Sequence, residues 1–264
     1  MELVVGGAKA FAYTAGREID PARPSVAFVH GAGLDHSWWG LQSRYFAYHG
    51  SNVLAVDLPA HGRSEGKPLE SIAAIADWVF ALLSALKLDK AAVVGHSMGA
   101  LAALEFAARH PQAAERIALI GIAYPMKVSD AFLDAARRND HAAYDMETIW
   151  GHAPQVPLGG NPNPGMWMYG DTLARLERLA PGVLYADLKA CNDYAAGFES
   201  AARVECPALF VLGARDMMTP PRAAEGLVRA IRNSSSVRVA HSGHSLMAEG
   251  PDATLDALIG FLAA

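Results

Sequence analysis

The chain has 264 residues, of which 52% are hydrophobic and 19% are charged, and its formal net charge is -5. This composition excludes a disordered chain and suits one large domain, or a core domain with an insertion. The sequence lacks a basic cluster, which argues against nucleic acid as a partner. Cys191 and Cys206 form no Cys-x-x-Cys pattern, so we expect two reduced thiols and neither a disulfide nor a zinc site.

We expect neither a signal peptide nor a membrane span. The first residues carry no basic segment followed by an apolar run, so no signal peptide is predicted. No stretch approaches 18 consecutive apolar residues, so no membrane span is predicted. We therefore expect a cytoplasmic protein.

Strand and helix patterns alternate through the first half of the chain. We expect a hairpin from residues 2–5 and 9–13, strands at 25–30, 52–57, 91–95 and 117–122, and helices at 71–86 and after Ser97. Ser71 is the expected cap of the first helix. This alternation predicts a parallel sheet with helices on both faces.

The alternation stops near residue 124 and resumes near residue 203. The intervening stretch is rich in Pro, Gly and large apolar residues, and a structureless loop of that length inside a compact domain is improbable. We expect a helical cap at 124–202, inserted between core segments 1–123 and 203–264. In the last segment we expect strands at 208–213 and 237–239 and helices at 221–231 and 251–262. The sheet would then have about eight strands.

The run Gly95-His96-Ser97-Met98-Gly99 fits the pattern G-x-S-x-G and follows a predicted buried strand. On such a strand-to-helix turn the serine hydroxyl is exposed at the top of the sheet, where it can act as a nucleophile. The two glycines are expected where a side chain would clash in the tight turn. Ser97 is therefore the candidate nucleophile.

A serine hydroxyl needs a base to remove its proton and an acid to orient that base. His244, in the loop before the closing helix, is the candidate base, and Asp216, just beyond the strand 208–213, is the candidate acid. All three residues follow predicted strands, where open parallel sheets place their sites. Asp187 and Asp193 compete with Asp216, but neither follows a clear strand.

The chain resembles the α/β-hydrolase superfamily over nearly its whole length, in its serine-nucleophile, esterase-like branch. His30-Gly31-Ala32-Gly33 resembles the H-G-x-G oxyanion loop of that family, and the order Ser, Asp, His is also the family's. Residues 57–64 resemble its D-x-P-G-H-G-x-S segment, although Ala60 replaces the usual glycine. We interpret this replacement as a backbone detail.

The resemblance implies roles for these residues. Ser97 would be the nucleophile, His244 the general base and then acid, Asp216 the orienting carboxylate, and the amides of Ala32 and Met98 the oxyanion hole. No metal or organic cofactor is implied. Related dehalogenases and epoxide hydrolases carry aspartate at the elbow, so a serine there favours acyl transfer over an alkyl-enzyme ester.

Several residues near these motifs could meet a substrate. We expect His30 and His61 to be loop histidines bonded to the backbone, and Asp57 to anchor a turn. The expected substrate contacts, drawn from the loops and from an apolar cap, are Gly31, Trp38, His96, Trp150, Trp167 and Met217.

The sequence thus predicts a serine hydrolase that acts on a small-to-medium, mainly apolar carboxylic ester or related acyl substrate through an acyl-enzyme. A lactonase and a carbon–carbon bond hydrolase acting on a vinylogous diketone remain alternatives, because the same triad serves all three. A non-catalytic small-molecule receptor on the same fold is the alternative from another class.

Overall fold

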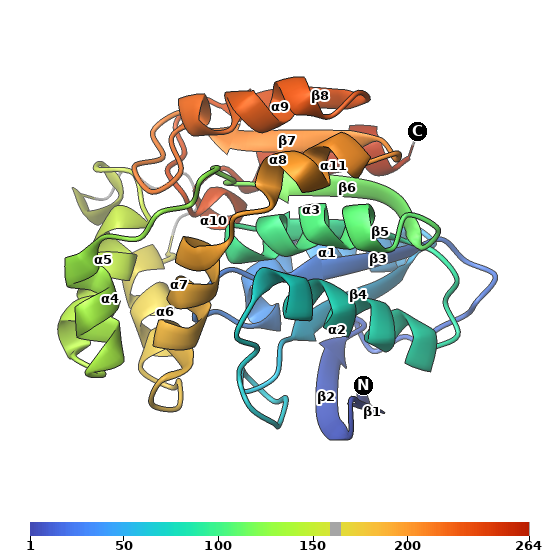
Figure 1. The fold of residues 1–264 in the computed structure, drawn as a ribbon, viewed down its shortest axis with the longest axis horizontal. Coiled ribbons are helices and arrows are strands. Elements are labelled where there is room, and N and C mark those ends of the chain that lie inside the picture. The colour runs from blue at the N-terminus through green and yellow to red at the C-terminus, as the bar shows by residue number, and fades with distance from the viewer. Residues whose placement is uncertain (159–164, 264) are drawn as a thin grey trace.

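The computed structural model describes residues 1–158 and 165–263, and within these ranges eight strands form one sheet (Figure 1). The strands are β1 (Glu2–Val5), β2 (Ala8–Tyr13), β3 (Ser25–Val29), β4 (Asn52–Asp57), β5 (Ala91–His96), β6 (Ala114–Ile120), β7 (Ala208–Gly213) and β8 (Ser234–Val239). Their order is β1-β2-β4-β3-β5-β6-β7-β8, and every pair from β4 to β8 is parallel. The predicted hairpin, β1 with β2, lies antiparallel at one edge. The predicted fold class is confirmed.

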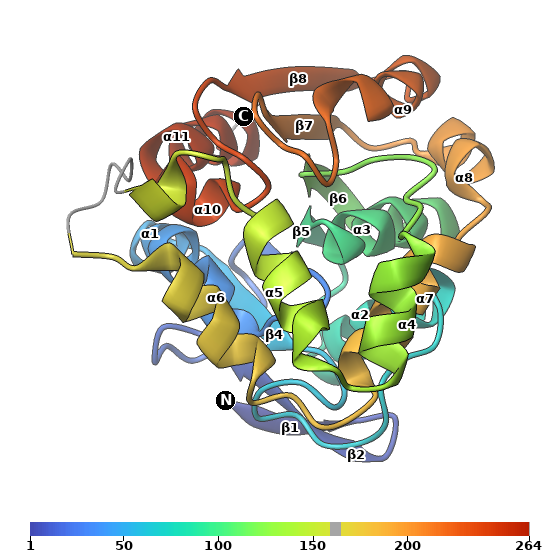
Figure 2. The ribbon, with the colours of Figure 1, turned by 90° about the vertical axis from the view of Figure 1, so that its left-hand side faces the viewer.

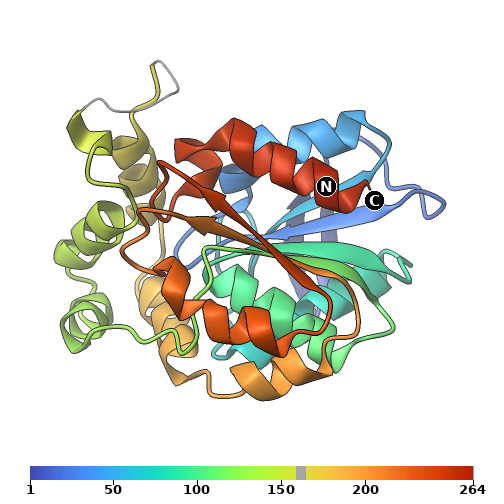
Figure 3. The same ribbon diagram turned by 90° about the horizontal axis from the view of Figure 1, so that it is seen from above.

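Both faces of the sheet are buried, as β3 illustrates. Its alternate residues Val26 and Phe28 pack into one apolar cluster, and Ala27 and Val29 pack into the other. Helices cover each face, with α1 and α11 on one side and α2, α3, α8 and α9 on the other (Figure 3). This double burial explains why the central strands are apolar without alternation. These helices are α1 (Gly40–Tyr48), α2 (Ile72–Ala85), α3 (Met98–Arg109), α8 (Gly197–Arg203), α9 (Glu225–Ala230) and α11 (Pro251–Leu262).

Four helices lie across the carboxyl ends of the parallel strands, and we call them the cap (Figures 1 and 2). They are α4 (Asp130–Arg137), α5 (His141–Trp150), α6 (Met168–Leu176) and α7 (Val183–Asp193). They fall within the predicted insertion 124–202, whereas α8 packs on α3 in the core layer. Residues 159–164, in the Gly- and Pro-rich part of the insertion, lie outside the described residues.

Some elements differ from those expected. The predicted helix 221–231 is split into a 3-10 turn, η3 (Pro221–Ala223), and α9, and β8 begins three residues before the predicted strand 237–239. The short helices η1 (His36–Trp39), η2 (Val156–Leu158) and α10 (Leu246–Glu249), together with α1, were not predicted. The expected cap of α2 is confirmed, because Ser71 Oγ accepts a hydrogen bond from the Ala74 amide. None of the described helices is both long and apolar enough to cross a bilayer.

Candidate active site

Ser97 occupies a strained turn between β5 and α3. Its φ of 53° and ψ of -114° lie outside the regions that a serine normally adopts. The flanking glycines leave no room for side chains: a Cβ on Gly95 would lie 2.0 Å from the Gly99 carbonyl oxygen, and one on Gly99 would lie 2.2 Å from the Val29 oxygen. The turn that exposes Ser97 therefore requires glycine at both positions.

His244 and Asp216 come together at the carboxyl ends of β7 and β8. His244 Nδ1 lies 2.8 Å from Asp216 Oδ2, and both side chains are almost fully buried. Burial disfavours the charged imidazolium, but the Asp216 carboxylate and its hydrogen bond outweigh that effect and raise the pKa of His244. In the same way, burial opposes ionisation of Asp216, yet His244 and Thr219 together lower its pKa. The two side chains thus form an ion pair when His244 takes up a proton.

Thr219 completes the surroundings of Asp216, and the sequence analysis missed it. Its hydroxyl donates to Asp216 Oδ2 at 2.6 Å and lies 3.0 Å from His244 Nδ1. The amides of Met218 and Thr219 donate to Asp216 Oδ1. An aspartate followed by a threonine three residues later is typical of a turn that the aspartate side chain closes, which was the available signal.

His96, which precedes Ser97, contacts the backbone and the ring of His244. Its Nε2–H donates to the His244 carbonyl oxygen at 2.9 Å, and the two rings lie 4.6 Å apart. Burial, aided by the neighbouring His244, holds the pKa of His96 well below its usual value, so the ring is neutral. His96 therefore contacts the loop that carries His244 and is not among the residues that line the cavity next to Ser97, so it is not placed as the predicted substrate contact.

A cavity of about 220 Å³ opens between Ser97 and the cap. Its apolar wall consists of Met126, Val128, Phe132, Trp150, Leu188, Met217 and Met218. Ala32, from the predicted oxyanion loop, lines it too, and a Cβ on Gly31 would lie 3.3 Å from Ser97 Cβ. His244 Nε2 is buried and accepts no hydrogen bond from the described residues, Ser97 included. Such bonds are commonly long in the absence of substrate.

The predicted oxyanion donors lie beside Ser97. Met98 is the first residue of α3, so its amide has no partner within the helix. Ala32 precedes Gly33, whose amide donates to Asp187 Oδ2 on α7 at 2.8 Å. The same oxygen lies 2.8 Å from His61 Nε2. A cap carboxylate therefore anchors the loop that carries Ala32.

The other loop residues behave largely as expected. His30 Nδ1 donates to the Gly31 carbonyl and Nε2 accepts from the Leu58 amide, which makes it neutral, and burial lowers its pKa to about 4. Asp57 anchors a turn, as predicted, by accepting from the amides of His36 and Arg63. Among the described residues, Asp35, His36 and Asp57 are close enough to share a metal ion. The Asp57 oxygens are instead used by these turn contacts.

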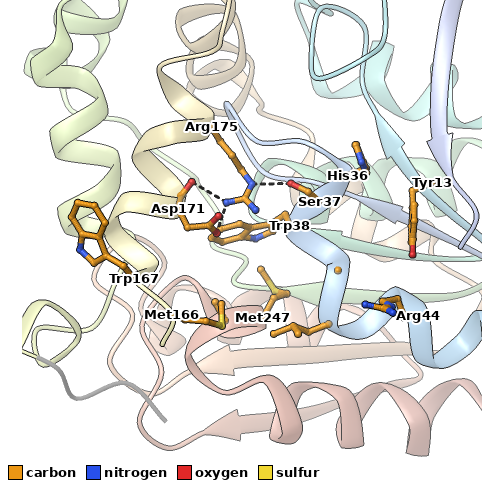
Figure 4. Close-up of a pocket in the computed structure, with 13 residues that line it drawn as sticks. Tyr13, His36, Ser37, Trp38, Arg44, Met166, Trp167, Asp171, Arg175 and Met247 are labelled. Atoms are coloured by element: carbon orange, nitrogen blue, oxygen red, sulfur yellow. Dashed lines mark hydrogen bonds and ion pairs between the residues drawn. The ribbon is translucent and has the colours of Figure 1, made fainter. Parts of the chain in front are cut away.

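Two predicted substrate contacts lie elsewhere. Trp38 and Trp167 line a second pocket of about 540 Å³, and Ser97 is not among the residues that form it (Figure 4). Arg175 also lines this pocket. Its guanidinium donates to Ser37 Oγ and to the Asp171 carbonyl oxygen, and it lies over the Trp38 ring. Trp167 is 77% exposed, whereas Trp150 and Met217 line the cavity at Ser97.

Comparison with known proteins agrees with this geometry. The sequence matches the model of the alpha/beta hydrolase family over residues 26–257, which is most of the chain. The chain belongs to the alpha/beta hydrolase family. The prediction made from the elbow, the oxyanion loop and the triad order is confirmed at this level.

Several similar proteins are hydrolases. A pimeloyl-[acyl-carrier protein] methyl ester esterase from Aromatoleum aromaticum is 30% identical over 258 residues, covering 87% of this chain and 94% of its own. The AB hydrolase superfamily protein YisY from Bacillus subtilis is 28% identical over 244 residues, covering 88% of each chain. The enol-lactonase from Burkholderia xenovorans LB400 has a TM-score of 0.87 over the full length of both chains at 22% identity, which shows a shared fold.

Proposed function

We propose that this alpha/beta hydrolase is a serine esterase that acts on small-to-medium, mainly apolar carboxylic esters through a covalent acyl-enzyme. The observation that carries the proposal is the 2.8 Å pair of His244 Nδ1 and Asp216 Oδ2, with the His244 ring 4.6 Å from that of His96, the neighbour of the strained Ser97. Asp216 fixes the tautomer in which His244 Nε2 is free to accept a proton. The description of one relative as a methyl ester esterase supports an ester as the substrate.

The chemistry follows from these positions. As Ser97 Oγ attacks the ester carbonyl, His244 Nε2 accepts its proton, and the Ala32 and Met98 amides would hold the oxyanion. Collapse of the tetrahedral intermediate breaks the carbon–oxygen bond, and His244 returns the proton to the departing alcohol. Water then attacks the acyl-enzyme with the same base, releasing the carboxylic acid and restoring Ser97.

The cavity supports the predicted substrate class. Its walls are apolar side chains of the cap and loops, and its volume of about 220 Å³ suits an acyl chain of modest length. Lys127 also lines it, but its ammonium is exposed and donates to the Asn192 carbonyl. No contact among the described residues favours a lactone or a vinylogous diketone over an open-chain ester.

The test is hydrolysis of a chain-length series of p-nitrophenyl esters by the wild type and by Ser97→Ala. We expect turnover that falls by at least about a thousandfold in Ser97→Ala while the melting temperature is kept. Ser84→Ala, an exposed serine on α2, is the matched control and should retain wild-type activity. Undiminished turnover in Ser97→Ala would reject Ser97 as nucleophile, and no turnover by the wild type would redirect the search to lactones, diketones or a receptor role.

A further inference from the structure

A buried carboxyl group, one oxygen of which has no hydrogen-bond partner among the described residues, lines the cavity next to Ser97. Glu147, on cap helix α5, is 8% exposed, and its Oε2 forms no hydrogen bond with any described residue. It stands on the inward face of α5, one turn from the fully buried Ala143. Folding alone would be served better by an apolar side chain here, because burying an unpaired carboxyl is costly.

Glu147 is also close to the reacting groups. It lines the same cavity as Ser97, and its charge and that of His244 influence each other's pKa. Burial is the main effect on Glu147 itself and raises its pKa to about 7. The carboxyl is therefore available to whatever part of a substrate fills the cavity.

Other polar side chains that line the cavity already have hydrogen-bond partners in the protein. The Thr219 hydroxyl donates to Asp216, and the Lys127 ammonium donates to Asn192. Ser129 Oγ accepts from the Phe132 amide as the cap of α4, and the Cys191 thiol is a weak donor. The rest of the wall is apolar and includes Phe132 and Trp150, whose rings meet edge to face at 5.8 Å. A polar group of a substrate that enters this wall would find Glu147 as its partner.

We infer that Glu147 is a specificity site that binds a hydrogen-bond donor, an amide N–H or a hydroxyl, on the substrate beyond the scissile ester. A carboxyl group keeps at least one acceptor oxygen in both of its protonation states, so it serves a donor in either state. It could serve a carbonyl only when protonated. The inference rests on the proposed function and refines it, because it adds that the apolar acyl group of the substrate carries one hydrogen-bond donor.

The experiment uses pairs of p-nitrophenyl esters that differ only by N–H against CH2. The pairs are N-acetylglycine with 4-oxopentanoate, N-acetyl-β-alanine with 5-oxohexanoate, and N-acetyl-4-aminobutyrate with 6-oxoheptanoate. For at least one pair, the wild type should hydrolyse the amide with a kcat/KM about tenfold above that of the ketone, as a charge-assisted hydrogen bond allows. The ratio is measured within each protein, so changes in overall activity cancel.

Variants assign the preference to Glu147. Glu147→Leu should bring the ratio to about one, whereas Glu147→Gln, which keeps an acceptor oxygen but loses the charge, should retain part of the preference. Glu177→Leu removes an exposed carboxylate just after α6 and should keep the wild-type ratio. The inference is overturned if no amide exceeds its ketone in the wild type, or if the advantage survives in Glu147→Leu.

A second measurement distinguishes a failure of the esterase proposal from a failure of the Glu147 donor site. Binding of the same ester pairs to Ser97→Ala protein by isothermal titration calorimetry reports the preference without turnover. One outcome is that the wild type hydrolyses no ester while Ser97→Ala still binds the amides about tenfold more tightly than the ketones. If the Ser97→Ala, Glu147→Leu double variant then loses this preference for the amides, the donor site stands and the esterase proposal falls. Equal binding of amide and ketone overturns the donor site.

Discussion

Asp187 and His61 form a buried pair that joins the cap to the core, with His61 Nε2 2.8 Å from Asp187 Oδ2 and side chains that are 2% exposed or less. His61 Nδ1 faces the Pro59 carbonyl at 3.0 Å, so both ring nitrogens meet acceptors. Burial disfavours the charged ring, but Asp187 outweighs it and raises the pKa of His61. Because the same carboxylate accepts a hydrogen bond from the Gly33 amide, this ion pair also fixes the loop that carries Ala32.

We expect Asp187→Asn to lower both stability and kcat. The change leaves the imidazolium of His61 buried without a counter-charge, which costs about 3 kcal/mol or more of unfolding free energy. It also loosens the loop that carries Ala32, so kcat should fall more than KM changes. Urea unfolding and steady-state kinetics measure the two effects.

The control for Asp187→Asn is Asp193→Asn on the same helix. Asp193 is half exposed and pairs with Lys189 on the surface, so its loss should change the unfolding free energy by less than about 0.5 kcal/mol. An Asp187→Asn protein with normal kcat would mean that the cap does not position the predicted oxyanion loop.

The pH dependence of kcat/KM should report His244. The base must be neutral to accept the Ser97 proton, and its pKa is raised above 6.5, so kcat/KM should rise with pH to a midpoint above 6.5. In Asp216→Asn the counter-charge is gone while burial remains, so the midpoint should move to lower pH. The plateau should also fall by about 10⁴-fold because the tautomer of His244 is no longer fixed. A midpoint that stays in place would show that another group sets the acidic limb.

The fold could be predicted because its signals are local. Apolar runs separated by turn residues mark the parallel strands, and G-x-S-x-G marks the elbow. Helix α1 was missed because its buried face includes Gln42 and Ser43, which interrupt the apolar period. Gln42 is accommodated by donating to the carbonyl of Met247, more than two hundred residues away, which sequence spacing cannot reveal.

The cap side of the site could not be predicted for the same reason. Asp187 meets His61 and Gly33 across more than a hundred residues, and Trp150 and Trp167 look alike in the sequence but face different pockets. Ala60 shows a finer limit. Its φ of 70° is in the left-handed region that favours glycine, so the departure from the family pattern is a backbone feature, as interpreted, that strains the turn before His61.

Thr219→Val should lower kcat by about tenfold. Valine keeps the shape of threonine but removes the hydroxyl that donates to Asp216 Oδ2 at 2.6 Å, and tenfold corresponds to about 1.4 kcal/mol. The backbone bonds to Asp216 Oδ1 remain, so the effect should be far smaller than that of Asp216→Asn. Thr219→Ser restores the hydroxyl and should recover most of kcat. If valine and serine behave alike, packing and not the hydrogen bond is the role of Thr219.

The unfolding free energy of Glu147→Gln, relative to that of the wild type, should be higher at alkaline pH than at acidic pH. The folded-state pKa of Glu147, about 7, is above the ordinary value of 4.5, so the folded protein binds more protons than the unfolded chain between these values. Wild-type stability therefore falls through this group as pH rises from 4.5 to 7, by at most about 3 kcal/mol. Glutamine does not ionise, so the variant escapes this loss.

Urea unfolding of both proteins at pH 5 and pH 8 measures the difference, in which the other titrating groups cancel. Glu177→Gln, at an exposed carboxylate, should show the same offset from wild type at both pH values. An offset for Glu147→Gln that does not grow between pH 5 and pH 8 would mean that the buried carboxyl ionises without penalty and has a partner in solution.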